Sequence, residues 1–425
     1  MKKIQGKLMF KWMTDLFPVC RSICGPGFKK SLMYLNKQKL DLKILNFPSG
    51  SKVFDWVVPN EWHIKDAYIQ DSRGKKFAEF KKNNLHVVNF SQSINKVLNK
   101  KEILKKIFSD KKNKNAIPYI TSYYKKDWGF CMKERDKRKL KGNKFKAIID
   151  SKFIKGNLKI GELCLKGKNK KEIFFSTYLC HPSMANNELS GPVVQTALVN
   201  FIKKNYKKTN FSYRFVYLPE TIGSIAYLSR NLKNLKKNVI AGFNLTCLGD
   251  ENAYSLVKSK ENNTISDKAL KSALFMKKNY KEYSFIHNGS DERQYCSPGV
   301  DLPVATFCRS KFGEYKEYHT SLDNLNFVTP KALQESLDIL IDIVICFEEF
   351  LYPKSKILCE PFLSKYGLYK SMTTKYDYKN IQNILNEINY ANGKKSIFDI
   401  SLTIGVEINS LIKIYKELKN KKIIY

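Results

Sequence analysis

Apolar positions along this 425-residue chain fall into two textures. In the middle of the chain, continuous apolar runs such as EIFFSTYLC (172–180) and YRFVYLP (213–219) alternate with stretches of helical periodicity, 190–206 and 221–235. Continuous apolar runs are typical of strands buried on both faces, and helical crossovers join such strands in parallel order. Residues 148–352 are therefore predicted to form an α/β core with a mixed, mostly parallel sheet flanked by helices.

Segments of a different texture surround this core. Residues 1–50 begin with an amphipathic helix around LMFKWMTDLFPV, and residues 51–147 alternate apolar and polar positions between turn signals, which predicts a small β-rich region. The core ends with a long helix over 330–352, opened by Pro330. Residues 353–425 comprise a linker, two or three short helices and a β-prone end, IIY, and this order is the outline of a winged helix.

The formal net charge of +37, from 76 Lys and Arg against 39 Asp and Glu, ordinarily indicates nucleic acid or an anionic membrane surface as a partner. Here the basic residues are mostly lysines spread along the whole chain. Runs such as KKNKN (111–115) lie between the periodic segments, where solvated loops are expected. We interpret the charge as a solvated basic surface rather than a polyanion site.

Cysteine usage and hydropathy indicate a cytoplasmic chain. Most of the ten cysteines stand singly in apolar runs, without a CxxC pair, and free thiols fit a reducing compartment. Lys7, Lys11 and Asp15 interrupt the first apolar stretch before a signal-peptide core forms. No window approaches 18 uninterrupted apolar residues, so no membrane span is predicted.

Polar side chains follow the first buried strand. His181 comes directly after EIFFSTYLC, and Asn187 and Glu188 precede a Ser-Gly pair that begins the next helix. Parallel sheets bind ligands just beyond the carboxyl ends of their strands, so all three side chains are expected at that edge. A lone histidine beside proline is as often a turn residue as a ligand, and its neighbours decide between the two.

Further acids and a second histidine belong to the same edge. Glu220 ends the second buried strand, where a general base for a metal-activated water would stand, although an acid at a helix start is also often a cap. Asp291 and Arg293 precede the buried run LPVATFC (302–308), and His319 follows it in EYHTSLDN. Two of the five histidines thus lie at strand ends flanked by acids.

The order of these motifs resembles that of the zinc aminopeptidases with two co-catalytic metals, over about residues 148–350. Outside that range, VPNEWHIKDAYI and IPYITSYYKKDWGFC, like CHPSMANNELSGP and YLPETIGS within it, are similar to bacterial aminopeptidase-like proteins with an inserted β domain and a C-terminal winged helix. The resemblance implies that residues 1–50 contribute to the peptidase-like core. It also implies that 51–147 form the inserted domain and that 353–425 hold the linker and the winged helix.

The chain departs from the two-metal pattern at three positions. Asn187 stands where the bridging aspartate is expected, Thr221 replaces the second glutamate, and Thr246 replaces the aspartate of the next strand. A dinuclear site is therefore not expected. The resemblance implies one zinc per chain, held by His181 and His319.

The resemblance also implies roles for the nearby acids, with Glu220 as the general base. A hydrolytic zinc needs three protein ligands and an open position, and Glu188, Asn187 or Asp291 would provide the third ligand. Glu188 is favoured because a carboxylate offsets the charge of the ion better than an amide. Asp291 then belongs to the catalytic group as hydrogen-bond partner of an imidazole.

Three functions stay open. The leading hypothesis is a zinc hydrolase of the aminopeptidase type, acting on an amide bond of a small peptide or aminoacyl-like substrate whose carboxylate or phosphate Arg293 receives, unless Arg293 is only a surface residue. The second is single-zinc acyl transfer or cyclisation on the same fold. The third is a degenerate peptidase fold used for binding, with the winged helix engaging a protein or nucleic acid. The resemblance further implies surface-polysaccharide biosynthesis as the context.

Overall fold

An eight-stranded sheet forms the centre of the computed structural model, which describes residues 3–368 and 375–425. The four central strands run parallel, and antiparallel pairs join the flanking strands on both sides. At the far edge, β14 and β15 are parallel to each other. In spatial order the strands are β1 (Lys43–Pro48), β10 (Asn157–Leu165), β12 (Ser212–Leu218), β11 (Glu172–Tyr178), β13 (Val239–Leu245), β16 (Val304–Cys308), β14 (Tyr254–Val257) and β15 (Tyr280–Tyr283). The predicted mixed, mostly parallel sheet is confirmed.

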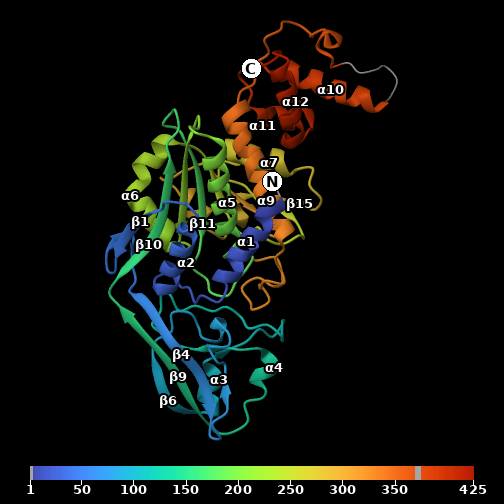
Figure 1. Ribbon diagram of the computed structural model, residues 1–425. Coiled ribbons are helices and arrows are strands. Elements are labelled where there is room, and N and C mark those ends of the chain that lie inside the picture. Colours follow the sequence, from blue (N-terminus) through green and yellow to red (C-terminus); the bar gives the residue numbers. More distant parts are fainter. Residues whose placement is uncertain (1–2, 369–374) are drawn as a thin grey trace.

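Helices cover both faces of this sheet (Figure 1). α1, α5 and α9 pack against one another on one face with α7 beside α9, whereas α6 lies on the other face against β10. The helices of the core are α1 (Lys3–Leu16), α2 (Pro26–Asn36), α5 (Ser190–Asn205), α6 (Ile222–Asn238), α7 (Ile265–Leu274), α8 (Glu292–Tyr295) and α9 (Pro330–Ile345). Because both faces are covered, every residue of β11 and β12 is buried.

The helix predicted over 330–352 consists of α9 and a π-helical turn, Cys346–Phe350. Its start follows the expected chemistry: the Thr329 hydroxyl accepts a hydrogen bond from the amide of Ala332, and Pro330 occupies the first turn.

The β-rich region forms a separate layer at the bottom of Figure 1. It contains a four-stranded antiparallel sheet in the order β5-β4-β9-β6, and two long paired strands, β4 and β9, lead away from the core. Its elements are β2 (Lys52–Val53), β3 (Trp56–Val57), β4 (Glu61–Asp71), β5 (Lys76–Phe77), β6 (Ile94–Asn99), α3 (Lys100–Lys105), β7 (Ile107–Phe108), β8 (Phe130–Cys131), α4 (Glu134–Lys137) and β9 (Lys144–Ile154). We call it the inserted unit.

The C-terminal segment packs three helices, α10 (Lys375–Tyr390), α11 (Ile397–Ile404) and α12 (Ile408–Asn420). Its β-prone end pairs as expected, since Ser355 and Ile424 form an antiparallel bridge. α11 and α12 contact α7, and ion pairs join Lys268 to Asp399 (2.9 Å) and Lys277 to Glu407 (3.1 Å). Part of the predicted linker, 369–374, lies outside the described residues.

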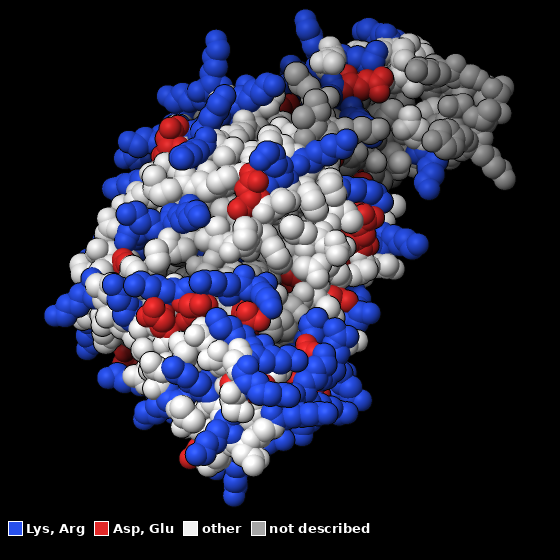
Figure 2. All heavy atoms as spheres, turned by 60° about the horizontal axis from the view of Figure 1, so that its bottom comes forward, with Lys and Arg blue, Asp and Glu red and all other residues white. Residues whose placement is uncertain are grey.

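The surface carries the basic residues that the composition requires. Lys and Arg side chains are spread over much of the face seen in Figure 2, most densely in its lower part, with carboxylates between them. All ten cysteines are free thiols. Within residues 3–368 and 375–425, no helix is long and apolar enough to cross a membrane.

Candidate active site

His181 lies at the carboxyl end of β11, and its two ring nitrogens face different surroundings. Nδ1 lies 2.7 Å from Oε1 of Glu188, and Nε2 lies 3.4 Å from Oε2 of Glu220. The carbonyl of His181 accepts a 3.0 Å hydrogen bond from Nε of the buried Arg21. The ring is therefore fixed between two carboxylates. We call its Nδ1 surroundings the inner side and its Nε2 surroundings the pocket side.

The inner side contains a compact set of metal-ligating groups. One ligand atom each from Cys180, His181 and Glu188 lies within 4.8 Å of the others, and all three residues are buried. Glu188 also accepts a 2.5 Å hydrogen bond from the amide of Cys180. Burial raises the pKa of the Cys180 thiol to about 12, with Glu188 adding to the shift, so the thiol is neutral at ordinary pH. Sequence reasoning missed Cys180, whose only signal is its place beside His181.

Asn187 and Thr246, two of the three residues that replace carboxylates of the two-metal pattern, form hydrogen bonds between uncharged groups. The Asn187 side-chain amide donates to the Tyr178 hydroxyl (2.8 Å), and its Oδ1 lies 3.2 Å from Nδ1 of His181. The Thr246 hydroxyl lies 2.5 Å from that of Tyr178 and donates to the Asn187 carbonyl (3.1 Å). Asn187 and Thr246 are thus parts of one neutral, buried network.

Asp323 holds the turn after His181 in place. Its carboxylate accepts hydrogen bonds from the backbone amides of Ala185 (3.1 Å), Asn186 (2.6 Å) and Asn187 (2.9 Å). Burial raises the pKa of Asp323 to about 6, although these amides oppose the shift. Sequence reasoning missed this residue, which stands four positions after His319 in the same motif.

Glu220 lies on the pocket side, on a turn that Asp291 supports. Oδ1 of Asp291 accepts hydrogen bonds from the Thr221 amide (2.7 Å) and from the Ser224 hydroxyl (2.8 Å). Oδ2 of Asp291 is buried without a hydrogen-bond partner. Asp291 was predicted to partner an imidazole, but both of its hydrogen bonds go to the turn that carries Glu220.

Glu292, the next residue in the chain, fixes the loop that carries Asp291. Glu292 accepts hydrogen bonds from the amides of Gly289 and Ser290 and from side chains of β13 and β16, so it holds the loop to the sheet. Arg293, predicted to bind substrate, is exposed and donates to the Ser290 carbonyl (3.3 Å).

His319 lies beside His181, as the strand-end rule predicts. The two ring centroids are 5.2 Å apart and nearly perpendicular, and the His319 ring stacks on Tyr318 at 3.9 Å. Nε2 of His319 is buried and has no hydrogen-bond partner. Burial, followed by the charge of His181, lowers the pKa of His319 well below its ordinary value. A neutral imidazole with an unused nitrogen is suited to bind a metal ion or to accept a hydrogen bond from a substrate.

Four turns around the two histidines hold non-glycine residues at positive φ: Ser183 (50°), Thr221 (64°), Cys247 (51°) and His319 (53°). Such backbone costs about 1–3 kcal/mol per residue and clusters at functional sites. The hydrogen bonds that the carboxylates of Asp323 and Asp291 accept stabilise two of these turns.

A pocket of about 390 Å³ opens on the pocket side of His181. Glu220, Thr221 and His319 line it together with His181, and the opposite wall comes from the inserted unit, residues 119–124. The Tyr119 ring lies 4.6 Å from that of His181, and its hydroxyl lies 2.5 Å from the Tyr123 hydroxyl. These tyrosines were not among the site residues predicted from the sequence.

Burial and charge act in opposite directions on the two central groups. Burial raises the pKa of Glu220 to about 7; His181 opposes this rise, whereas Glu188 adds to it. For His181, burial lowers the pKa, but Glu188 and Cys180 raise it well above its ordinary value. The raised pKa of His181 favours a protonated imidazole when no ion is bound, and the charge of this imidazole offsets part of the rise at Glu220.

The donors present fit one zinc ion. Sulfur, imidazole nitrogen and carboxylate oxygen are the ligand types of zinc, and Cys180, His181 and Glu188 provide them within 4.8 Å of one another. His319 is not part of that close group, but its Nε2 is unpartnered and offers a second imidazole. On the inner side Glu188 already engages Nδ1 of His181, so the nitrogens free to hold an ion are Nε2 of His181 and Nε2 of His319. Glu188 as a direct ligand stays a prediction.

Comparison with solved structures places the fold in one class, the aminopeptidase-like proteins. A zinc aminopeptidase from Bacillus subtilis has a TM-score of 0.56 at 15% identity, with coverage of 80% of this chain and 94% of that one. An aminopeptidase from Aneurinibacillus sp. has a TM-score of 0.52 at 14% identity, over 81% and 95%. At such identities the likeness shows the fold. The resemblance stated from the motifs is confirmed.

The chain belongs to the family described as a domain of unknown function (DUF4910), which matches residues 10–349. A winged helix-turn-helix family matches residues 351–425, which confirms the predicted winged helix. A Clostridium acetobutylicum protein named "Putative polysaccharide biosynthesis protein with aminopeptidase-like domain" is 38% identical over 96% of this chain and 93% of its own. The crystal structure of a "putative peptidase" from that organism has a TM-score of 0.90 at 35% identity, over 100% and 97%.

Proposed function

We propose that this protein is a zinc-dependent hydrolase of amide bonds with one metal per chain and Glu220 as general base. The observation that carries the proposal is the pocket side of His181: a carboxylate 3.4 Å from Nε2, beside a buried imidazole with an unpartnered nitrogen, on the wall of a pocket. The zinc aminopeptidases of the same fold support it.

Two imidazoles, those of His181 and His319, would hold the ion through Nε2 as two of the three protein ligands of a hydrolytic zinc; the candidates for the third are still Glu188, Asn187 and Asp291. Glu188 orients His181 through Nδ1, as carboxylates commonly do behind zinc-bound histidines. Zinc at this place would supply a Lewis acid and lower the pKa of a bound water. The neutral network of Asn187 and Thr246 offers no carboxylate for a second ion.

Glu220 accepts a proton from water and returns it to the leaving nitrogen. Its pKa of about 7 suits both directions of transfer near neutral pH. Asp291 keeps the Thr221 turn in its positive-φ conformation and so keeps the Glu220 carboxylate at the pocket wall. Tyr119 and Tyr123 close the opposite wall and reduce the access of bulk water.

The substrate we propose is a small aminoacyl-like amide carried on a sugar. The 38% identical relative, named for polysaccharide biosynthesis, supports the sugar, and the aminopeptidase-like fold supports the amide. The pocket of about 390 Å³ accommodates a small group rather than a long peptide.

Metal analysis of the purified full-length chain, together with an amide-hydrolysis assay, tests the proposal. We expect a zinc-to-chain ratio near one and hydrolysis of N-aminoacyl glucosamines that a chelator stops and zinc restores. A ratio near two would contradict the neutral role of Asn187 and Thr246. A ratio near zero in zinc-supplemented cultures, with hydrolysis unaffected by the chelator, would overturn the proposal.

A further inference from the structure

Aromatic rings form a continuous path from the candidate active site to a second pocket. The Tyr119 hydroxyl meets that of Tyr123, the ring of Tyr123 lies 6.2 Å from Tyr124, and Tyr124 contacts Trp56 edge-on at 5.1 Å. Phe90 lies 5.4 Å from Tyr123. All of these rings come from the inserted unit, so this unit extends the pocket side of His181 outward.

The second pocket has about 540 Å³ and shares Tyr123 and Tyr124 with the pocket that His181 lines. Phe90 and Phe153, whose rings are 5.2 Å apart, form another part of its wall. Tyr124 is 65% exposed and Phe153 38% exposed, so aromatic surface is open to a ligand. This volume falls within the usual range for small-molecule sites, about 300–1,000 Å³.

Polar groups surround these rings. Asn60, Gln92 and Ser122 line the pocket with amide and hydroxyl groups, and the exposed Lys125 and Lys126 add two positive charges. A flat aromatic surface with amides at its rim fits a pyranose ring, which has C–H groups on its face and hydroxyls around its edge. The two lysines fit a carboxylate or phosphate on that ring.

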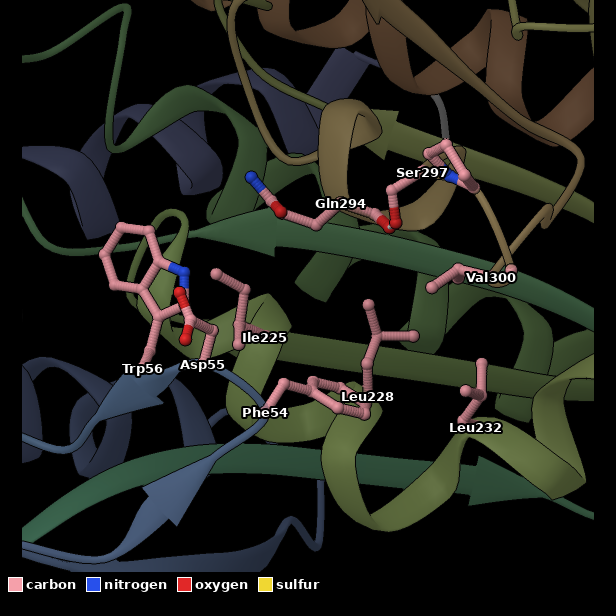
Figure 3. A pocket seen from close by; sticks show the side chains of 11 residues that line it. Phe54, Asp55, Trp56, Ile225, Leu228, Leu232, Gln294, Ser297 and Val300 are labelled. Atoms are coloured by element: carbon pink, nitrogen blue, oxygen red, sulfur yellow. Dashed lines mark hydrogen bonds between the residues drawn. The ribbon is translucent and has the colours of Figure 1, made fainter.

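A third pocket lies on the other side of Trp56 and differs in chemistry. It has about 400 Å³, and Figure 3 shows Trp56 and Asp55 at one end and Leu232 and Val300 at the other. Its apolar α6 wall and the carboxylate of Asp55 do not suit an anion. The second pocket is therefore the place for an acidic group.

We infer that the second pocket binds an acidic sugar residue in the part of the substrate that does not react, an inference that rests on the proposed function because it names the substrate class of that site. The ring stacks on the aromatic wall of Tyr124 and Phe153, and its acidic group lies beside Lys125 and Lys126. The shared tyrosines then place the attached amide in the pocket that Glu220 lines.

Binding of defined oligosaccharides to the full-length protein tests this inference without requiring turnover. The probe is a hyaluronan tetrasaccharide, in which glucuronate alternates with N-acetylglucosamine, and the control is the neutral N-acetylglucosamine tetramer. We expect the acidic tetrasaccharide to bind more tightly by isothermal titration, and the difference to shrink with added salt. Equal affinities, or no binding of either sugar, would overturn the inference.

Matched variants locate the binding site. Phe153→Ala should weaken binding of the acidic tetrasaccharide by about 3- to 10-fold, the contribution of one stacking contact, whereas Phe108→Ala, at an equally exposed phenylalanine outside the pocket, should not. Lys126→Gln should weaken it about 2- to 5-fold, against no change for Lys101→Gln on α3. Equal losses in the control variants would overturn the location.

Two further results separate this inference from the proposed function. Sugar binding that persists in a protein without zinc or hydrolysis would reject the proposed function and keep the second pocket as a saccharide site. Zinc and hydrolysis without sugar binding would reject only the saccharide site. Aromatic rings with lysines also bind single-stranded nucleic acid, so tighter binding of an oligothymidylate in the same titration would overturn the sugar assignment.

Discussion

The two sides of the His181 imidazole differ in what they can do. On the inner side, Glu188 lies 2.7 Å from Nδ1 and is itself fully buried and bound to the Cys180 amide. On the pocket side, Glu220 lies 3.4 Å from Nε2, and its side chain keeps 17% exposure. The two carboxylates therefore have different surroundings: the inner one is enclosed beside the ring, and the outer one is partly open to the pocket. This difference supports the proposed roles, with Glu188 positioning the ring and Glu220 meeting the reacting molecule.

The residues around Glu188 also differ from those around Glu220. The inner side is closed by a neutral network through Asn187, Tyr178 and Thr246. Nε2 of His319 and Oδ2 of Asp291 are buried without hydrogen-bond partners, and so is Oε1 of Glu188 on the inner side, although that oxygen lies 2.7 Å from Nδ1 of His181. Unpaired buried polar atoms are costly. Of these residues only His319 lines the pocket, so its Nε2 is where a ligand or ion is expected.

The largest expected effect belongs to Glu220→Gln. If Glu220 is the base, this variant keeps zinc but loses about 10²- to 10⁴-fold in turnover, because the amide cannot accept the proton. Steady-state kinetics and metal content are the measurements, with the exposed Glu261→Gln as control. Unchanged turnover would show that Glu220 is not the base. The proposed functional difference between the inner side and the pocket side of His181 would then fail as well.

His319→Ala should abolish zinc binding while the fold stays intact, because the ring lies at the sheet edge and its Nε2 has no other partner. His181→Ala should do the same, whereas His287→Ala, at an exposed histidine away from the pocket, should keep zinc. Zinc content after dialysis and circular dichroism are the readouts. Full zinc retention in both site variants would place the metal elsewhere.

Asp323→Ala should lower the free energy of unfolding by about 2 kcal/mol or more, because the buried amides of Asn186 and Asn187 lose their acceptor at about 1–3 kcal/mol each. The Ala185 amide keeps the backbone carbonyl of residue 323 as an acceptor. Asp323→Asn keeps one carbonyl oxygen and should cost less. Denaturant unfolding measures both. A loss below about 1 kcal/mol in the alanine variant would show that the turn after His181 does not depend on this clamp.

Glu188→Gln tests whether Glu188 positions His181 or binds the zinc ion directly. If Glu188 positions His181, zinc affinity should fall by about 10- to 100-fold and binding should persist. Competition with a zinc chelator measures the affinity. Complete loss of zinc would instead make Glu188 a direct ligand, as the sequence analysis favoured, and would place the ion partly on the inner side.

The smallest expected effect is a pH dependence of stability in the metal-free protein. Glu220 has its pKa raised by burial to about 7 in the folded chain, against about 4.3 when unfolded. Between these values the folded chain binds more protons, so this contribution is present below about pH 4 and is lost as pH rises through about 7. Relative to Glu220→Gln, the wild type should become less stable from pH 5 to 8 in thermal melts; a constant difference would contradict the raised pKa.

Much of the fold and part of the site could be predicted from the sequence. Uninterrupted apolar runs such as 172–180 require strands covered on both faces, and because each is followed by a helix, their polar ends must meet at one edge of the sheet. This local rule brought His181, Glu220 and His319 together. It also placed Asp291 near them, since the loop that carries it precedes another strand of the same sheet.

Tertiary structure alone decided how these groups face one another. Which nitrogen of His181 meets Glu188 and which meets Glu220 depends on side-chain rotamers and on turns at positive φ, which residue order does not specify. The pocket wall of Tyr119 and Tyr123 comes from the inserted unit, about sixty residues earlier in the chain, and no periodicity links it to the strand ends. Contacts between distant segments are set by how the whole core packs, so only the folded chain shows that the inserted unit completes the site.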